Sequence, residues 1–288
     1  MIMGYLGHLA KSYLRNRQIL FWGPAWWAFW VALGAYVYPR GFQLPPSAPV
    51  GEVMRSYTAV WLSEGVAYLP STVGVGVVAT ILYSTAAYPY LIRFGRATPR
   101  KITLSLFLSA LAATLVLDAV LIVAGVLMMA SGLRYNGFDV GLPDVSPASA
   151  ANAAEFAGVS VLASVFVIAL STALATAAGA APKYSRAISF APMLLFFLFA
   201  FAALYGALPK WLLAASPFSA LIYLGVYAYT GTVPNVTLTA PPPLSDDPAP
   251  LGLCLASVIL WTLALLAVSA FVVGRMAYRP PAEEREGA

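Results

Sequence analysis

Charged residues are scarce in this sequence. Aspartate, glutamate, lysine and arginine make up 9% of the 288 residues, whereas hydrophobic residues make up 61%. A soluble domain usually carries about a quarter charged residues, so this composition excludes an ordinary soluble fold. No charged stretch is long enough to form a soluble domain beside the hydrophobic segments. We therefore predict a single transmembrane domain over residues 1–279, followed by a short charged cytoplasmic tail over 280–288.

Histidine and cysteine are almost missing as well. His8 is the only histidine and Cys254 the only cysteine, which excludes a disulfide framework, a cysteine or histidine metal cluster and a bis-histidine haem site. A phosphate-binding Gly-Lys-Ser/Thr sequence does not occur, and Gly74-Val75-Gly76 follows no strand. We expect no catalytic, cofactor-binding or metal site in this chain. The net charge of +5 is better explained by membrane orientation than by nucleic acid binding.

Hydrophobic segments long enough to cross a membrane recur along the whole chain. About 20 apolar residues in a helix cross a hydrocarbon core of about 30 Å. Because an unpaired charge in lipid is costly, charged residues serve here to delimit these segments. The pattern predicts an all-α integral membrane protein with six spans, at about 19–38, 66–92, 102–129, 156–181, 187–208 and 251–274.

The basic residues are divided unevenly between the loops that six spans would create. Of the 16 lysines and arginines, only Arg40, Arg55, Arg134 and Lys210 fall on the side opposite the termini. Short cytoplasmic loops carry an excess of basic residues. We therefore predict a multi-pass protein of the cell (plasma) membrane with both termini in the cytoplasm.

The segment Trp211–Tyr229 is apolar enough to be a seventh span. Pro217 and the following Thr-Gly-Thr-Val-Pro favour a shorter element, and a seventh crossing would move the basic C-terminal end outside. We predict a re-entrant or interfacial helical element on the outer face, before the last span. Composition favours outer loops at Gly41–Ser63, Ser131–Ala154 and Thr230–Pro250.

The first twenty residues alternate leucine and tyrosine with polar and basic residues. This spacing is typical of an amphipathic interfacial helix, with Lys11, Arg15 and Arg17 toward anionic headgroups of the inner leaflet. A positive flank that only sets membrane orientation is an open alternative.

A compact basic turn lies between the second and third predicted spans. Thr98-Pro99 interrupts helical geometry there, and the turn could fit a groove on a cytoplasmic partner or only satisfy the charge rule. Its candidate contact residues are Arg93, Phe94, Gly95, Arg96, Arg100 and Lys101.

Asp118 is the only charge inside the predicted spans. Intramembrane carboxylates are often functional, but without a second ionisable partner in any span we favour a structural residue. Glycines such as Gly74 and Gly76 are expected to allow close helix packing. The tryptophans are expected mostly at the interface or facing lipid, with a ligand site less favoured. Asn235-Val236-Thr237 is an acceptor sequence for N-glycosylation.

These features together resemble the membrane subunit of an ABC-2 type transporter. The phrase Ile92–Lys101 is similar to that family's loop between its second and third spans. Ala215-Ser216-Pro217-Phe218 resembles the outer-face segment that these permeases place between their last two spans.

The resemblance implies the permease subunit of an ATP-driven exporter that couples through cytoplasmic loops. ATP and Mg²⁺ would be held by separate ATPase subunits below the membrane. Arg93–Lys101 would form the main coupling loop, Lys183, Tyr184 and Arg186 a second one, and Pro217 with Phe218 an outer gate. The implied partners are those ATPase subunits, a second copy or a related permease, and membrane lipids, with no nucleic acid. The alternative is a non-transporting anchor or assembly subunit of a larger membrane complex; a lipid-modifying enzyme is less favoured.

Overall fold

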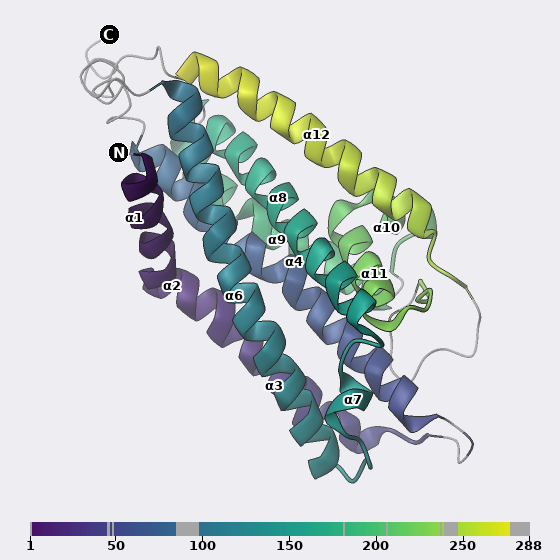
Figure 1. The fold of residues 1–288 in the computed structure, drawn as a ribbon. Helices are drawn as coiled ribbons and strands as arrows, with labels where there is room; N and C mark the ends of the chain where they lie inside the picture. The colour runs from purple at the N-terminus through teal and green to yellow at the C-terminus, as the bar shows by residue number, and fades with distance from the viewer. Residues whose placement is uncertain are drawn as a thin grey trace.

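The computed structural model describes residues 2–44, 47, 49–84, 98–180, 182–205, 207–236, 238 and 247–276. Over these residues the chain is an elongated bundle of helices (Figure 1). Six helical segments are long and apolar enough to cross a membrane: Arg17–Gly41, Val50–Leu82, Leu104–Tyr135, Ala150–Ala175, Ser185–Tyr205 and Leu251–Phe271. The predicted all-α, multi-pass architecture is therefore confirmed.

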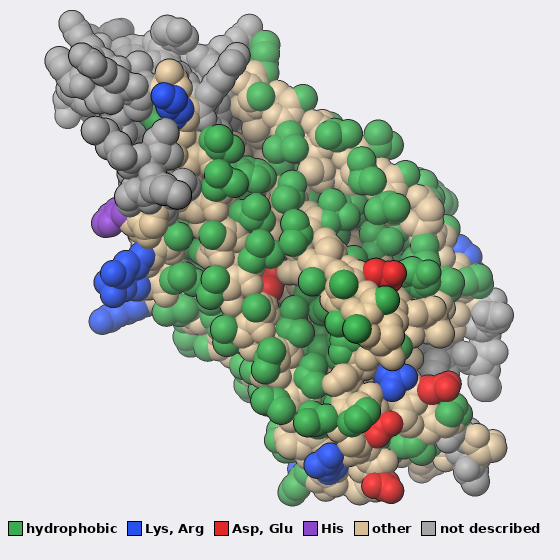
Figure 2. All heavy atoms as spheres, viewed as in Figure 1, with side chains coloured by type: hydrophobic (Ala, Val, Ile, Leu, Met, Phe, Trp, Pro, Cys, Tyr) green, Lys and Arg blue, Asp and Glu red, His purple; other side chains and the backbone are tan. Residues whose placement is uncertain are grey.

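Apolar side chains cover the outside of the bundle between its two ends. Figure 2 shows hydrophobic side chains over most of one face, with charged side chains gathered toward the ends. A soluble protein rarely exposes so continuous an apolar surface, whereas lipid accepts it. The exposed aliphatic residues on the third and sixth candidate spans include Leu104, Leu108, Val116, Val120, Val123, Leu127, Leu253, Leu255, Ile259, Leu260, Leu263 and Val268.

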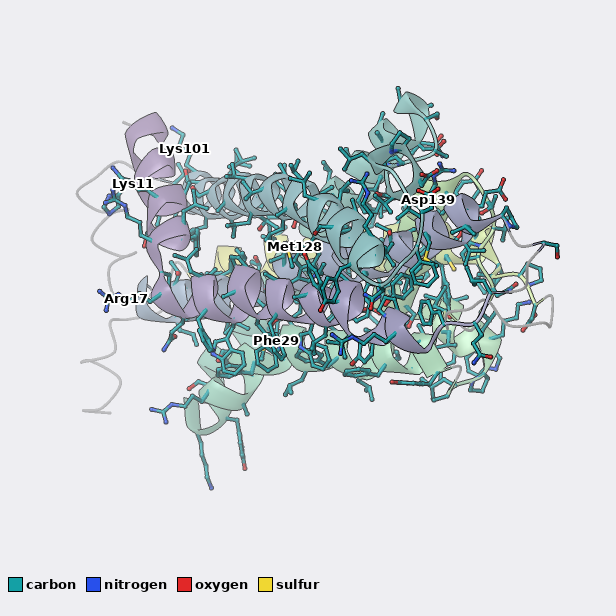
Figure 3. All side chains as sticks on the ribbon, turned by 90° about the horizontal axis from the view of Figure 1, so that it is seen from below. Lys11, Arg17, Phe29, Lys101, Met128 and Asp139 are labelled. Atoms are coloured by element: carbon teal, nitrogen blue, oxygen red, sulfur yellow. The ribbon has the colours of Figure 1, made fainter. Side chains whose placement is uncertain are left out.

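Helix α1 (Ile2–Arg15) precedes the first candidate span and lies crosswise to it (Figure 3). Asn16 separates the two helices, because its side-chain oxygen accepts hydrogen bonds from the backbone N–H groups of Gln18 and Ile19 at the start of α2 (Arg17–Leu20). Leu9 and Tyr13 of α1 are buried against the bundle. The basic residues of this region are exposed, namely Lys11, Arg15 and Arg17. The predicted amphipathic helix is present.

The first candidate span changes its helical pitch in one place. A π-helical turn, Phe21–Ala25, joins α2 to α3 (Trp26–Tyr36), and Pro24 lies inside it. Proline has no backbone N–H to donate, so one carbonyl of the preceding turn loses its partner. The hydroxyl of Tyr68 on the second span donates to the carbonyl of Trp22. A side chain from a neighbouring helix thus contributes a hydrogen bond to the irregular turn.

Helix α4 (Val50–Ser84) contains the most buried of the six candidate spans and occupies the centre of the bundle. Around it lie α3, α6 (Pro99–Tyr135), α8 (Ala150–Ala180) and α9 (Ser185–Tyr205). The last helix, α12 (Leu251–Met276), contains the least buried span and packs mainly on α8 and α11.

The second span begins earlier than predicted. Helix α4 includes Glu52, Arg55 and Glu64, so the predicted loop Gly41–Ser63 is wrong from Val50 onward. Its 35 residues measure about 52 Å, which exceeds a hydrocarbon core of about 30 Å and leaves room for charges at an overhanging end. The predicted end of this span, at residue 92, lies outside the described residues.

The other predicted loops are partly helical. Within Ser131–Ala154, α6 continues to Tyr135, a short helix α7 (Leu142–Val145) follows, and α8 begins at Ala150. The described part of the third predicted loop, at 231–236, 238 and 247–250, is not helical. Helical ends therefore reach beyond the apolar stretches that the sequence suggested.

Two short helices form a hairpin between the fifth and sixth spans. Helix α10 (Lys210–Ala215) ends at Ser216, whose backbone is extended, and α11 (Pro217–Thr230) turns back. At 14 residues, α11 measures about 21 Å, too short to cross the membrane. Apart from Tyr227 its residues are buried.

Both ends of this hairpin lie at the end of the bundle opposite the termini. Lys210 forms an ion pair with Asp247, just before α12 begins, and the hydroxyl of Tyr229 donates to the carbonyl of Val145. The turn between the helices reaches inward, because the hydroxyl of Ser257, within α12, donates to the carbonyl of Ala215 at 2.6 Å. The predicted re-entrant or interfacial element is present as a helical hairpin, and neither of its helices is long enough to cross a membrane.

Candidate functional site

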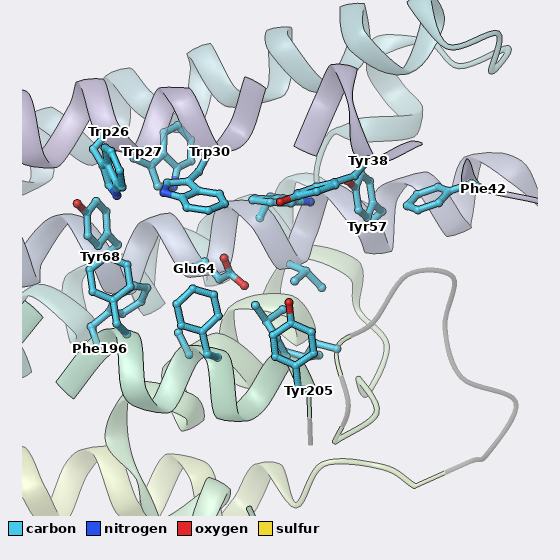
Figure 4. Close-up of a pocket in the computed structure, with 17 residues that line it drawn as sticks. Trp26, Trp27, Trp30, Tyr38, Phe42, Tyr57, Glu64, Tyr68, Phe196 and Tyr205 are labelled. Atoms are coloured by element: carbon cyan, nitrogen blue, oxygen red, sulfur yellow. The ribbon is translucent and has the colours of Figure 1, made fainter. Parts of the chain in front are cut away.

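An aromatic cavity of about 460 Å³ lies between α3, α4 and α9 (Figure 4). It forms because each helix presents one stripe of rings at the spacing that places side chains on a single helical face. The residues that line it are Trp26, Trp27, Trp30, Tyr38, Phe42, Tyr57, Val60, Trp61, Glu64, Tyr68, Phe196, Phe197, Ala200, Phe201, Leu204, Tyr205 and Leu238.

Glycines allow two of these indoles to fit between helices. A Cβ atom added to Gly65 would lie 2.2 Å from Nε1 of Trp27, and one added to Gly34 would lie 2.5 Å from Cε2 of Trp61. Each ring therefore fills space that only a glycine leaves free. The reciprocal contacts fix α3 against α4 and hold the tryptophan side of the cavity in place.

The cavity lies at about half the depth of the first span. Trp27 follows Arg17 by ten residues, which is about 15 Å along a helix and about half the thickness of a hydrocarbon core. Gly65, which Trp27 covers, is the neighbour of Glu64. The Glu64 carboxyl group therefore lies about halfway along the first candidate span.

Glu64 is the only charged side chain among the described residues that line the cavity. Figure 4 shows its carboxyl group pointing into the space between the rings. The side chain is half-buried, and no described residue donates a hydrogen bond to it. Within the described part of the chain, the one ion pair joins Lys210 to Asp247, so no described cation neutralises Glu64. An ionised carboxylate in such a place is costly without a partner.

Apart from Glu64, the polar groups of the described wall are four tyrosine hydroxyls and four indole N–H groups. The hydroxyl of Tyr57 donates to the carbonyl of Gly34 at 2.6 Å, and that of Tyr68 donates to Trp22, so both phenols are engaged with backbone. The indole N–H groups of Trp26 and Trp30 are buried and have no hydrogen-bond partner. Unpaired buried donors are uncommon in folded proteins, and because these two N–H groups have no exposed surface, they do not face the open space of the cavity.

This site was not predicted from the sequence. Glu64 lies between the predicted outer loop, which ends at Ser63, and the second predicted span, which begins at about residue 66. The statement that no second ionisable residue lies in a span is wrong because α4 continues through Glu64. The interpretation of the tryptophans was incomplete: Trp22, Trp211 and Trp261 are exposed as expected, but four others line the cavity. The spacing Trp26-Trp27-x-x-Trp30 was the available signal of a common helical face.

The predicted coupling residues lie partly outside the described chain. Arg93, Phe94, Gly95 and Arg96 are not among the described residues. Next to them, the side chain of Thr98 accepts a hydrogen bond from the backbone N–H of Lys101 and caps α6. Arg100 belongs to the first turn of α6, and Lys101 is exposed. Figure 3 shows Lys101 at the same end of the bundle as Lys11, far from Asp139.

The second predicted coupling group is a short turn between α8 and α9. Lys183 and Tyr184 lie in a 3₁₀ turn, Pro182–Tyr184, and Arg186 lies in the first turn of α9. All three side chains are exposed, and the Lys183 ammonium lies 5.8 Å from the centre of the Tyr184 ring. The turn offers two cations and one ring to a partner.

Asp118 lies away from the aromatic cavity, at the contact of α6 with α8. The hydroxyl of Ser160 donates to its Oδ2 at 2.6 Å, whereas Oδ1 is buried without a partner. This geometry connects two helices and supports the structural interpretation.

The remaining predicted residues lie on or beside the re-entrant hairpin. Pro217 and Phe218 begin α11 and are buried, and the Phe218 ring is 5.3 Å from that of Phe166 in the middle of α8. Asn235 is half-buried in a loop where it pairs with Pro248. Its acceptor sequence ends at Thr237, which lies outside the described residues.

The fold and the site together define a class: a six-span α-helical membrane protein with an aromatic cavity that contains one carboxyl group. Among the described residues, no group of three or more histidines, cysteines, aspartates or glutamates is placed to hold a metal ion. No protein-family model matches the sequence, and no curated protein matches it. The functional proposal therefore rests on the residues and their arrangement.

Proposed function

We propose that this chain is the permease subunit of an ATP-driven exporter of the ABC-2 type, located in the plasma membrane with both termini in the cytoplasm. The observation that carries the proposal is the re-entrant hairpin α10–α11, which enters between the fifth and sixth spans from the end opposite the termini. Combined with the crosswise α1 before the first span, it gives the element order that the resemblance implies.

A transport pathway needs a route for cargo, and the aromatic cavity supplies a candidate. It lies between the first, second and fifth candidate spans, about halfway along the first. Its wall is mostly apolar, which suits hydrophobic or amphipathic cargo rather than small hydrated ions. In the proposed assembly, a second permease subunit would face this side of the chain and enclose the pathway.

Energy would come from separate ATPase subunits at the end that carries α1. The exposed basic residues there, including Lys101, Lys183 and Arg186, would contact acidic or polar grooves on the ATPases. Movement of these contacts would pass along rigid helices to Pro217 and Phe218, which pack against the middle of the bundle.

Co-expression tests the proposal directly. The full chain would be expressed with each ABC ATPase subunit of the same genome that lacks its own membrane domain, then purified through a tag on the chain. We expect one ATPase to be retained, and a Lys183→Glu, Arg186→Glu double variant to lose it. Arg40→Glu is the matched control, because Arg40 is an exposed arginine at the opposite end of the bundle. Failure of every ATPase to be retained would refute the exporter assignment.

A further inference from the structure

We infer that the aromatic cavity binds a hydrophobic organic cation, with the positive charge of the ligand placed beside Glu64. If this cation is also the exported cargo, that part of the inference rests on the proposed function. Binding of the cation to the cavity depends only on this chain and needs no ATPase. Three properties of the cavity lead to it: its charge, its rings and its size.

The sign of the charge selects a cation. Within the described part of the chain, Glu64 is the one charged side chain of the wall, and no cation lies beside it. Halfway along a candidate span, an unpaired carboxylate has lost much of its hydration. A bound cation would replace that lost interaction, whereas an anion of the same size would be repelled by Glu64.

The rings select an organic cation over a metal ion. Aromatic faces attract ammonium-type groups within about 6 Å of the ring centre, and Figure 4 shows rings from three helices around the Glu64 carboxyl group. A hard metal ion instead needs several oxygen ligands. The described wall offers one carboxyl group and four phenols, and two of these phenols, those of Tyr57 and Tyr68, are engaged with backbone carbonyls.

The size and polarity of the wall select a hydrophobic cation. A volume of about 460 Å³ accommodates a molecule with several rings or a branched apolar body. A sugar or a peptide backbone would leave many hydroxyl or amide groups unpaired against these rings.

A pair of ions with equal shape and opposite charge tests the inference. The full chain would be placed in phosphatidylcholine nanodiscs, and the binding of radiolabelled tetraphenylphosphonium would be measured by equilibrium dialysis, with empty nanodiscs subtracted. Tetraphenylborate gives the anionic counterpart. We expect saturable binding of the phosphonium ion and none of the borate.

Variants then locate the binding. Glu64→Gln is expected to weaken phosphonium binding by on the order of 10-fold or more, because a charge-assisted contact is lost, and Glu64→Asp should retain part of the affinity. Trp61→Leu removes one ring and should weaken binding about 3-fold to 10-fold. Glu52→Gln is the control, since Glu52 lies on the same helix but is exposed outside the cavity.

Each of these binding measurements either supports the inference or overturns it. Absence of saturable phosphonium binding, equal binding of the two ions, or a Glu64→Gln variant with unchanged affinity would overturn the inference. The comparison of the two ions uses the unmodified chain, so it decides even where a variant does not fold. No ATPase takes part in the measurement. A chain that binds the phosphonium ion but retains no ATPase would refute the exporter proposal and leave the cation site standing.

Discussion

The hydroxyl of Ser160 on α8 donates a hydrogen bond of 2.6 Å to Oδ2 of Asp118 on α6, and both side chains are buried. The other carboxyl oxygen of Asp118 is buried without a partner. Asp118 does not line the aromatic cavity, where the second intramembrane carboxyl group, that of Glu64, is found. The two carboxyl groups therefore occupy different environments: Asp118 contacts a neighbouring helix, and Glu64 faces open space.

Replacing Asp118 by asparagine is expected to leave the fold and transport intact. The amide has the same shape, and its oxygen can still accept the Ser160 hydrogen bond, while the buried carboxyl group is removed. Thermal unfolding in detergent and transport after reconstitution with the ATPase would check this. Normal unfolding combined with lost transport would show instead that the Asp118 carboxyl group is functional.

At Gly132 the backbones of α6 and α3 are in close contact. A Cβ atom added there would lie 2.5 Å from the backbone oxygen of Ala35 and 2.6 Å from its Cβ. Because backbone cannot move aside as a flexible side chain can, we expect Gly132→Ala to destabilise the protein by about 1–3 kcal/mol. The free energy of unfolding can be measured by denaturant titration in mixed micelles.

Gly158→Ala is the matched control for that substitution. Gly158 also lies inside a long helix, α8, but is exposed, and no atom lies within 4 Å of the added Cβ. Alanine favours helix over glycine by about 1 kcal/mol at such a site, so this variant should be as stable as the unmodified chain or more so. If Gly132→Ala and Gly158→Ala lowered the free energy of unfolding equally, the contact of Gly132 with Ala35 would not limit helix packing.

Several features of the fold could be predicted because they depend on local patterns. The six candidate spans follow from the lengths of the apolar stretches, and the re-entrant hairpin from Pro217 and the distribution of basic residues. The start of α4 could not be predicted in this way. Arg55 is accommodated there because it donates to the carbonyls of Pro143 and Ser146, which are about 90 residues away in the sequence.

The aromatic cavity could not be predicted from local sequence patterns either, because it also depends on contacts between distant segments. Whether a tryptophan faces lipid or a cavity depends on the helix opposite it, and the contacts of Trp27 with Gly65 and of Trp61 with Gly34 join separate spans. Glu64 was left outside the second predicted span because a charge in lipid is costly. That rule does not separate a residue facing lipid from one facing an internal cavity.

Arg55 is expected to fix the linker between α6 and α8. Its Nε donates to the carbonyl of Ser146 at 3.1 Å, and its Nη2 donates to that of Pro143 at 2.9 Å. Arg55→Ala should therefore destabilise the chain by about 1–3 kcal/mol and open residues 137–149 to limited proteolysis. Arg55→Lys should restore little of this stability, since a single ammonium group does not reproduce the forked geometry of a guanidinium. Unchanged protease resistance in both variants would contradict this role.

Site-directed labelling is expected to show that residues on either side of the hairpin face the same compartment. Ala207 and Val233 are exposed and lie before α10 and after α11, respectively. Because the hairpin turns back at Ser216, Ala207→Cys and Val233→Cys should react with a membrane-impermeant maleimide from one side of sealed vesicles. Lys183→Cys should react from the other side. The native Cys254 is fully buried and can be kept as the unreactive background.

The same labelling separates the hairpin from a seventh crossing and tests the proposed orientation. A crossing at Trp211–Tyr229 would place Ala207→Cys and Val233→Cys on opposite sides, so reaction of only one of them from a given side would refute the hairpin. With a hairpin, the side on which Lys183→Cys reacts identifies the end that carries α1 and the basic residues. The positive-inside rule requires that side to be cytoplasmic. Reaction of Lys183→Cys from the exterior of intact cells would remove the basis for ATPase coupling, because a cytoplasmic ATPase could not reach Lys101, Lys183 or Arg186.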